Sequence, residues 1–218
     1  MERDEVWAAY ADQKTRVVEL LEQLSPSEWN RPTLCEQWTV RDLAGHLTMQ
    51  GMTIGDAVRT MVREPAVRKA SLGGMNRIIC EMAKVRARVP IEGLLDQIRA
   101  TIATPRANPG LTEREALVDI VLHSQDLALP LGRELAVRPQ IAAIAADNVL
   151  SYAGSWKGTV FGDLGARGYR LVATDIDWSR GAGPMIEGPI VGLLLLIGGR
   201  PAGLDQLTGP GVTALRRR

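Results

Sequence analysis

The chain has 218 residues, 45% of them hydrophobic and 23% charged, which excludes a disordered, a collagen-like or a polytopic membrane protein. Lys and Arg number 26 and Asp and Glu 25, so a net charge of +1 provides no bulk positive field that would attract nucleic acid or an anionic membrane. The charged N-terminus has no apolar stretch behind it, which predicts no signal peptide, and two cysteines are too few for a disulfide scaffold. We therefore expect a cytoplasmic protein without nucleic-acid or membrane partners.

The first part of the chain has the apolar periodicity of helices. Two of these helices begin at capping-box sequences, Thr39 with Asp42 and Thr112 with Glu115. The first of the two contains Gly51, which lowers its intrinsic stability and indicates a helix held by packing. The predicted helices are 4–24, 39–62, 71–88, 91–102, 112–129 and 139–152.

Beyond about residue 154 glycines become dense and the apolar period shortens. We place a domain boundary there, with residues 1–155 forming the helical domain that carries the site and residues 156–218 a small α+β region packed on it. The most apolar run, 190–197, is far shorter than the roughly 20 residues of a membrane-spanning helix and is predicted to be buried. The predicted elements of this region are strands at 169–174 and 185–187, a hairpin turn with an adjoining strand over 177–183, a helix over 189–197 and a closing segment at 204–207.

His46 and His123 are the only histidines, and each lies inside a predicted helix. At 100° per residue Asp119 and His123 lie about 40° apart on one helix face, with Asp126 beside them and apolar residues on both flanks. Such a narrow polar strip is expected to be buried, and buried carboxylates need a partner or a metal. Two imidazoles and a carboxylate suit a divalent metal with one open position, the arrangement of catalytic sites. The structural alternative is an ordinary buried histidine and a simple i,i+4 pair.

The two cysteines carry weaker signals. Cys35 lies on a loop before Trp38 and could be a nucleophile, but no histidine is close to it in sequence, so a small buried hydrophobe is favoured. Cys80 lies on an apolar helical stripe and is assigned to the core. The sequence contains no P-loop, GxGxxG, GxSxG or CxxC motif.

Three stretches together resemble one known family. WTVRDLAGHL at 38–47 resembles a signature of the mycothiol-dependent maleylpyruvate isomerase-like branch of the DinB-like superfamily. DIVLHSQDL at 119–127 is similar to the second metal-binding helix of that branch, and RLVATDIDW at 170–178 resembles part of its small C-terminal region. The resemblance covers nearly the whole chain. It implies a mainly α fold, a DinB-like four-helix bundle with one long crossover, and a small α+β C-terminal region.

The resemblance also implies a metal site. Carried over by position, His46 is the first ligand, His123 the last, and Asp119 the carboxylate, where better-known members have Glu. Because Asp is one methylene shorter, Asp126 is kept as an alternative ligand or as a residue that orients an imidazole. The expected metal is divalent, most often zinc, although ligands of this type accept several metals.

The activity implied by the resemblance is that of a mycothiol-dependent enzyme. Mycothiol is the thiol cosubstrate, and its metal-activated thiolate adds to an electrophilic substrate, in an isomerase or an S-transferase reaction. Arg133 and Arg200 are candidates to bind a carboxylate or the sugar part of the thiol, with helix-end capping as the favoured alternative. No catalytic residue is assigned, and a monomer or a homodimer is expected.

A non-catalytic function is the alternative. The C-terminal region shares features with sterol-carrier-like domains, and its apolar run at 189–197 could line a pocket. The protein would then be a small-molecule binding or carrier protein with a DinB-like fold. Metal content separates the two functions, because a carrier of this kind requires none.

Overall fold

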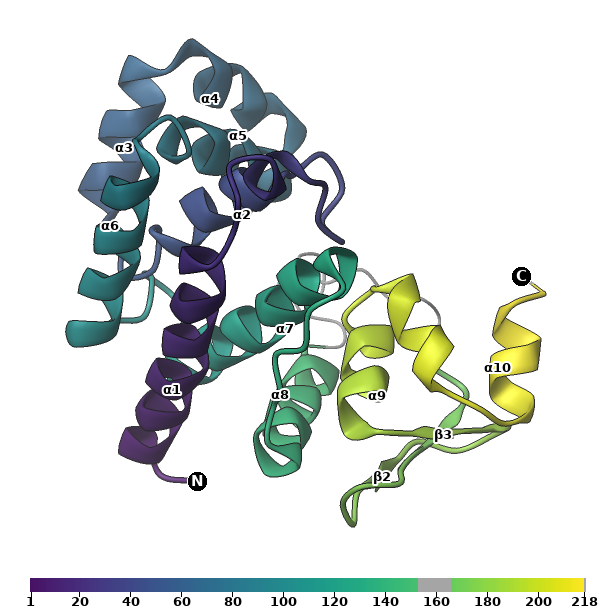
Figure 1. Cartoon of the computed structure of the whole chain (residues 1–218). Coiled ribbons are helices and arrows are strands. Elements are labelled where there is room, and N and C mark those ends of the chain that lie inside the picture. The colour runs from purple at the N-terminus through teal and green to yellow at the C-terminus, as the bar shows by residue number, and fades with distance from the viewer. Residues whose placement is uncertain (153–165, 218) are drawn as a thin grey trace. The chain divides into compact units, whose positions relative to one another are not determined.

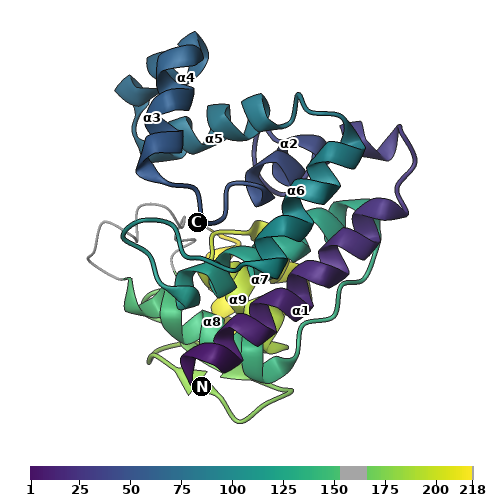
Figure 2. The same ribbon diagram turned by 90° about the vertical axis from the view of Figure 1, so that its left-hand side faces the viewer.

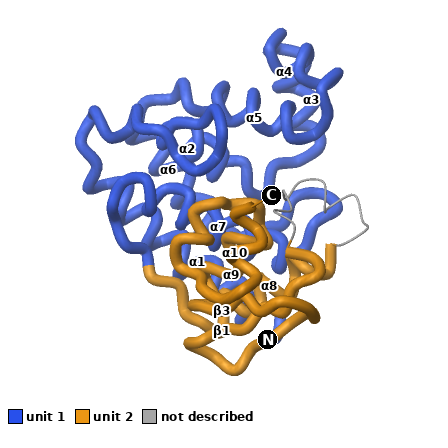
Figure 3. The backbone as a smooth tube through the Cα atoms, turned by 90° about the vertical axis from the view of Figure 1, so that its right-hand side faces the viewer, with its two compact units in different colours: residues 1–135 blue, residues 136–218 orange. Residues whose placement is uncertain are grey.

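The computed structural model describes residues 1–152 and 166–217 (Figure 1). The chain divides into two compact units, residues 1–135 and 136–218 (Figure 3). The boundary near residue 155 that the sequence suggests lies outside the described residues, and helix α8 (Pro139–Ser151) groups with the C-terminal unit. The candidate metal ligands His46, Asp119 and His123 all belong to the N-terminal unit.

Four helices form the core of the N-terminal unit: α1 (Arg3–Glu22), α2 (Val40–Leu47), α6 (Ile91–Ala103) and α7 (Glu113–Leu131). Helices α1 and α2 each contact both α6 and α7, so the four close into a bundle (Figure 2). The long connection between α2 and α6 is the crossover, which confirms the expected fold class. Each large side chain fully buried here contributes about 1.5–3 kcal/mol. They include Leu43, Leu94, Ile98, Leu117 and Leu122.

Helix α7 is held at both ends by local sequence, as predicted. The Thr112 side chain accepts a hydrogen bond from the Arg114 backbone N–H, and the Glu115 carboxylate accepts one from the Thr112 backbone N–H at 2.8 Å. At the other end Gly132 has φ +67°, the left-handed conformation that commonly follows the last helical residue. The positions of the side chains on α7 are therefore fixed by the capping as well as by burial.

The prediction of one helix over 39–62 is wrong. Helix α2 ends at Leu47, and a separate helix α3 (Ile54–Arg63) follows. Gly51 has φ +76°, which no helix accommodates, and Thr53 with Asp56 forms a second capping box that starts α3. As a result His46 lies in the last turn of a short helix, not in the middle of a long one.

The crossover continues through three more short elements. They are α4 (Pro65–Ala70), the 3₁₀ helix η2 (Ser71–Gly73) and α5 (Met75–Arg86), while the 3₁₀ turn η1 (Glu28–Asn30) lies between α1 and α2. Helix α5 packs closely on α2, and glycine at position 45 permits this approach: a Cβ there would lie 2.4 Å from the Ala83 carbonyl oxygen. Helix α4 was not predicted, and α3 and α4 lie beyond α5 at the outer end of this unit (Figure 2).

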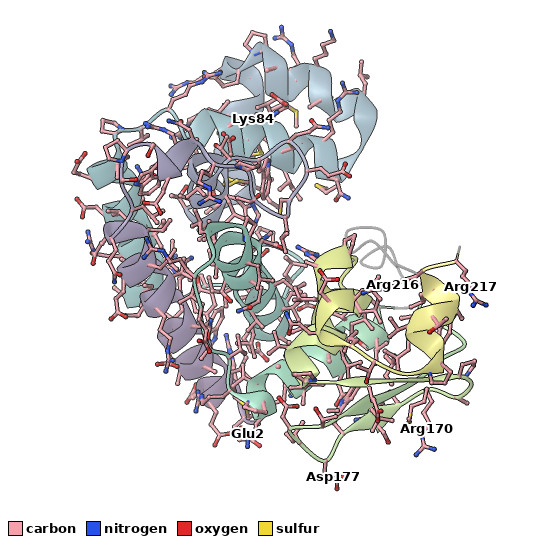
Figure 4. The ribbon with its side chains drawn as sticks, turned by 45° about the vertical axis from the view of Figure 1, so that its right-hand side comes forward. Glu2, Lys84, Arg170, Asp177, Arg216 and Arg217 are labelled. Carbon is pink, nitrogen blue, oxygen red and sulfur yellow. The ribbon has the colours of Figure 1, made fainter. Side chains whose placement is uncertain are left out.

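The C-terminal unit combines α8 with a small sheet and further helices. The strand order is β2-β1-β3, with β1 antiparallel to β2 and parallel to β3, and α9 contacts α8, β1 and β3. The turn between β1 and β2 exposes Asp177 (Figure 4). The elements are β1 (Arg170–Ala173), β2 (Ser179–Arg180), β3 (Met185–Gly188), α9 (Ile190–Ile197), η4 (Pro201–Gln206) and α10 (Pro210–Leu215).

Within the residues that the structure describes, no helix combines the length and the apolar character needed to cross a membrane. The apolar run at 190–197 is the short helix α9, and seven of its eight residues are buried, as expected.

Candidate metal centre

Two helices of the bundle present the candidate ligands. Helix α2 starts at the predicted capping box, in which Thr39 accepts from the Asp42 backbone N–H, and it carries His46 in its last turn. Helix α7 carries Asp119 and His123 one turn apart. The two histidine side chains are 13% and 11% exposed, whereas the Asp119 side chain is 36% exposed. Asp119 is thus the most exposed side chain of the three.

The structure brings the three side chains together. Asp119 Oδ1 lies 3.2 Å from His46 Nε2 and 3.4 Å from His123 Nε2, and all three donor atoms lie within 4.8 Å of one another. Two ligands bound at about 2.1 Å to a tetrahedral zinc ion are separated by roughly 3.4 Å. The donor set and its spacing therefore fit a divalent transition metal that keeps a fourth position for another ligand.

Asp126 lies on the opposite side of the His123 ring. Its Oδ2 is 2.8 Å from His123 Nδ1, and its side chain is fully buried. With the Nδ1 proton donated to this carboxylate, Nε2 is the nitrogen that can give up its proton and offer its lone pair to an ion beside Asp119. Carboxylates orient metal-binding histidines in this way in many proteins. Of the two roles considered for Asp126, the geometry fits orientation of an imidazole in the His46 cluster.

Trp38 covers both imidazoles. Its ring centroid lies 5.1 Å from that of His46 and 6.0 Å from that of His123, and the residue is 8% exposed. Its Nε1–H donates to Cys80 Sγ at 3.2 Å, which ties it to α5. Trp38 was not predicted to lie at the site, although this residue opens the same motif that contains His46.

The cluster holds opposite charges in a buried setting. Burial disfavours the ionised form of Asp119, but the charges of His46 and His123 outweigh it and hold the pKa of Asp119 well below its usual range. Burial likewise lowers the pKa of His123, but the charge of Asp119 and the hydrogen bonds to Asp119 and Asp126 outweigh it and raise that pKa well above its usual range. His46 Nδ1 is buried and, among the described residues, has no hydrogen-bond partner, an arrangement that costs about 1–3 kcal/mol. A cation that binds here must displace a proton from His123.

A buried lysine adjoins the cluster and was missed by the sequence analysis. Lys14 of α1 is 1% exposed, and its Nζ donates to Tyr10 Oη at 2.7 Å and to the Leu47 carbonyl oxygen at 2.9 Å. Burial lowers the pKa of Lys14 to about 7, although the charge of Asp119 offsets part of the effect. The available signal was its position, one turn from Tyr10 and from Val18 on the buried stripe of α1.

Cys35 lies closer to a histidine than its place in the sequence suggested. Its Sγ lies 3.2 Å from Asp126 Oδ2 and 3.7 Å from His123 Nδ1. Cys35 is half-buried, and its sulfur lies at hydrogen-bonding distance from a carboxylate oxygen. The prediction that Cys35 is a small core hydrophobe is therefore corrected. Cys80 is also half-buried and accepts the Trp38 hydrogen bond.

The two arginines have local partners. Arg133, just beyond α7, pairs with Glu28 at 3.2 Å. Arg200, beyond α9 in the C-terminal unit, donates to the Gly198 carbonyl oxygen. The Arg200 contact is of the helix-end type, whereas the Arg133 contact is an ion pair with a side chain of η1.

Known proteins with a similar sequence pattern or structure have the same fold as this chain. Residues 10–109 match the family model of the mycothiol maleylpyruvate isomerase N-terminal domain. Two solved structures, the mycothiol-dependent maleylpyruvate isomerase and its histidine-to-alanine mutant, align over 97% of this chain and 94% of theirs, with 13% identity and TM-scores of 0.59 and 0.60. Among curated proteins no sequence matches. The structural likeness, at this identity, establishes the fold alone.

Proposed function

Because residues 10–109 belong to the mycothiol maleylpyruvate isomerase N-terminal domain family, we propose that the chain is a divalent-metal enzyme that uses a small thiol, of the mycothiol-dependent isomerase or S-transferase type. The family name and the names of the two similar structures support mycothiol as the thiol. Zinc is the metal proposed, because two imidazole nitrogens and a carboxylate oxygen are its usual catalytic ligands.

The observation that carries the proposal is the convergence of three donor atoms from two helices. His46 Nε2, Asp119 Oδ1 and His123 Nε2 would hold the ion, and their number leaves a position for a thiol. Asp119 is the most exposed of the three, so a cosubstrate can approach from its side.

When bound, a divalent cation lowers the pKa of a coordinated thiol and supplies a thiolate near neutral pH. The chain's own residues prepare the site for that chemistry. Asp126 holds the proton on His123 Nδ1 and so keeps Nε2 available. Trp38 packs over both rings and excludes water from that side. No side chain is assigned as a general acid or base.

The thiol would form a bond to an electrophilic carbon of the substrate. Release of that adduct makes the reaction a transfer, whereas rotation followed by elimination of the thiol makes it a cis–trans isomerisation. Both reactions use the same thiol site, and the site described here does not favour one over the other.

Metal content is the first test. Purified parent protein is expected to contain about one equivalent of metal by elemental analysis. His46→Ala and Asp119→Ala, each made in Cys35→Ser protein because the Cys35 sulfur lies 3.7 Å from His123 Nδ1 and could hold an ion there, are expected to lose it. Asp96→Ala is the matched control, because this carboxylate is exposed on α6 and pairs with Arg99 outside the cluster. Unchanged metal in both cluster variants would remove these residues from the ligand set. A parent without metal would favour the carrier alternative.

Activity is the second test. Zinc-loaded protein is incubated with mycothiol and a panel of electrophiles, including cis-configured activated alkenes, and product is compared with the thiol alone. We expect a rate above the thiol background for at least one electrophile, lost in His46→Ala. A rate no higher than that of free mycothiol for all of them would refute the enzymatic proposal.

A further inference from the structure

Three donors of different chemistry meet on the Nδ1 side of the His123 ring, away from Asp119. Cys35 Sγ lies 3.2 Å from Asp126 Oδ2, Asp126 Oδ2 lies 2.8 Å from His123 Nδ1, and the sulfur lies 3.7 Å from that nitrogen. Around a tetrahedral zinc ion, sulfur, nitrogen and oxygen ligands are separated by roughly 3.4–3.6 Å. Small shifts of the side chains would bring all three to bonding distance of one ion.

We propose that Cys35, Asp126 and His123 form a second metal site, which takes a thiophilic divalent ion such as Zn²⁺ or Cd²⁺. Its ligands are a thiolate, a carboxylate oxygen and an imidazole nitrogen, a set that the harder cations Mg²⁺ and Ca²⁺ do not prefer. The fourth position is open to water or to a free thiol.

Backbone hydrogen bonds hold the loop that carries Cys35 beside Asp126, whether or not the Cys35 sulfur binds an ion. The Leu34 backbone N–H donates to the Asp126 carbonyl oxygen at 3.1 Å, so the loop that carries Cys35 is bonded to the residue that provides the carboxylate. The Cys35 backbone N–H donates to Thr33 Oγ1 at 3.1 Å, which fixes the loop next to the sulfur. Asp126 and His123 are buried, whereas Cys35 is half-buried and leaves a route for an ion.

Binding of an ion at the Cys35 site balances in protons and in charge. Without an ion, Asp126 Oδ2 can accept both from the Cys35 S–H and from the His123 Nδ1–H, so two protons occupy the place of one divalent cation. Binding of the ion releases those two protons and leaves the charge of the buried site unchanged, which avoids the cost of burying new charge. His123 keeps its remaining proton on Nε2, where Asp119 accepts it.

The two sites therefore compete for His123. An ion held by the Cys35 site uses Nδ1 and leaves a protonated Nε2, which cannot bind a cation at the His46 cluster. The Cys35 site would withdraw a ligand from the other site when thiophilic metal is in excess. The inference does not depend on the proposed function, because it concerns ligands that remain when His46 is removed.

The test uses Cd²⁺ and the full chain. In His46→Ala protein, Cd²⁺ is expected to produce the ultraviolet charge-transfer band of a cadmium thiolate that saturates at about one equivalent. Adding Cys35→Ser to this background should abolish the band, whereas adding Cys80→Ser, the matched control, should leave it unchanged. Asp126→Asn should weaken Cd²⁺ binding by at least the roughly 10–100-fold that loss of an outer hydrogen-bond partner costs a metal site. Far-ultraviolet circular dichroism checks that each variant is folded.

A second measurement needs no variant. Alkylation of the parent protein, followed by peptide mass analysis, should show that Cd²⁺ slows modification of Cys35 by tenfold or more and leaves Cys80 unaffected. A band that survives Cys35→Ser, the absence of any band in folded His46→Ala protein, or equal protection of both cysteines would overturn the proposal. Absence of mycothiol-dependent activity in zinc-loaded parent protein, together with a Cys35-dependent band in His46→Ala protein, would count against the proposed function only.

Discussion

Lys14→Met tests whether a buried cation lowers the stability of the bundle. Lys14 is 1% exposed, and its pKa falls from the ordinary 10.5 to about 7, because burial penalises the charged form more than Asp119 supports it. At about 1.4 kcal/mol per pKa unit, the charged ammonium costs the folded state about 5 kcal/mol. Methionine has a similar length and no charge. It removes this cost together with the hydrogen bonds to Tyr10 and to the Leu47 carbonyl oxygen, worth about 1–3 kcal/mol each.

The sign of the pH dependence follows from linkage. The folded pKa lies below the unfolded one, so between pH 7 and about 10.5 the unfolded chain binds more protons, and stability rises with pH in this window. Below pH 7 both states are protonated and the full cost applies. For the parent, this one group should raise the free energy of unfolding by about 2 kcal/mol between pH 7 and pH 9. Lys14→Met should lack that increase.

Urea unfolding of metal-free protein, followed by circular dichroism at pH 7, 8 and 9, measures the difference between parent and variant. Lys69→Met is the control, because Lys69 is exposed on α4. The free energy of unfolding of Lys69→Met should rise with pH in parallel with that of the parent. If the free energy of unfolding of Lys14→Met also rises in parallel with that of the parent, burial does not disfavour the charged form of Lys14 and the reasoning fails.

Three further outcomes follow from the structure. Asp126→Asn should lower zinc affinity by roughly 10–100-fold in a competition titration with a chelator, because His123 loses the acceptor that orients it; unchanged affinity would contradict that role. Gly45→Ala should lower the free energy of unfolding by about 1–3 kcal/mol in urea, because the new Cβ would clash with Ala83, whereas Gly55→Ala, in an open position of α3, should raise it by up to about 1 kcal/mol. Equal effects of the two glycine changes would contradict the close contact of α2 and α5. Trp38→Ala should lower the free energy of unfolding in urea by about 3–5 kcal/mol, because it empties a buried space, and Trp38→Phe should lower it markedly less. Similar losses in the two variants would show that packing of the aromatic ring does not stabilise the fold.

The cluster could be predicted from sequence because its parts leave local signals. Asp119 and His123 are one turn apart on a strongly apolar helix with a full capping box, so helical periodicity places them on one buried face. His46 follows the Thr39–Asp42 capping box within the same short helix. That the two helices are neighbours came from the family resemblance, because periodicity says nothing about which helices pack together.

Other features depend on contacts between distant segments and left no such signal. Cys35 meets His123 across 88 residues, and the burial of Lys14 depends on a carbonyl oxygen 33 residues away. The break of the predicted helix at 48–53 was readable in principle. Gly51 and the second Thr–Asp capping pair are both in the sequence, but the apolar pattern continues through them and favoured one helix.

His46 and Asp119 are separated by 73 residues along the chain, yet their donor atoms are 3.2 Å apart. An ion held by both, and by His123, would act as a cross-link between α2 and α7 that forms only in the native state. Ligands that bind only the folded state raise its stability with their free concentration, by about 2.7 kcal/mol at a hundred times the dissociation constant. The lifetime of this protein would then depend on metal supply even when it has no substrate to turn over.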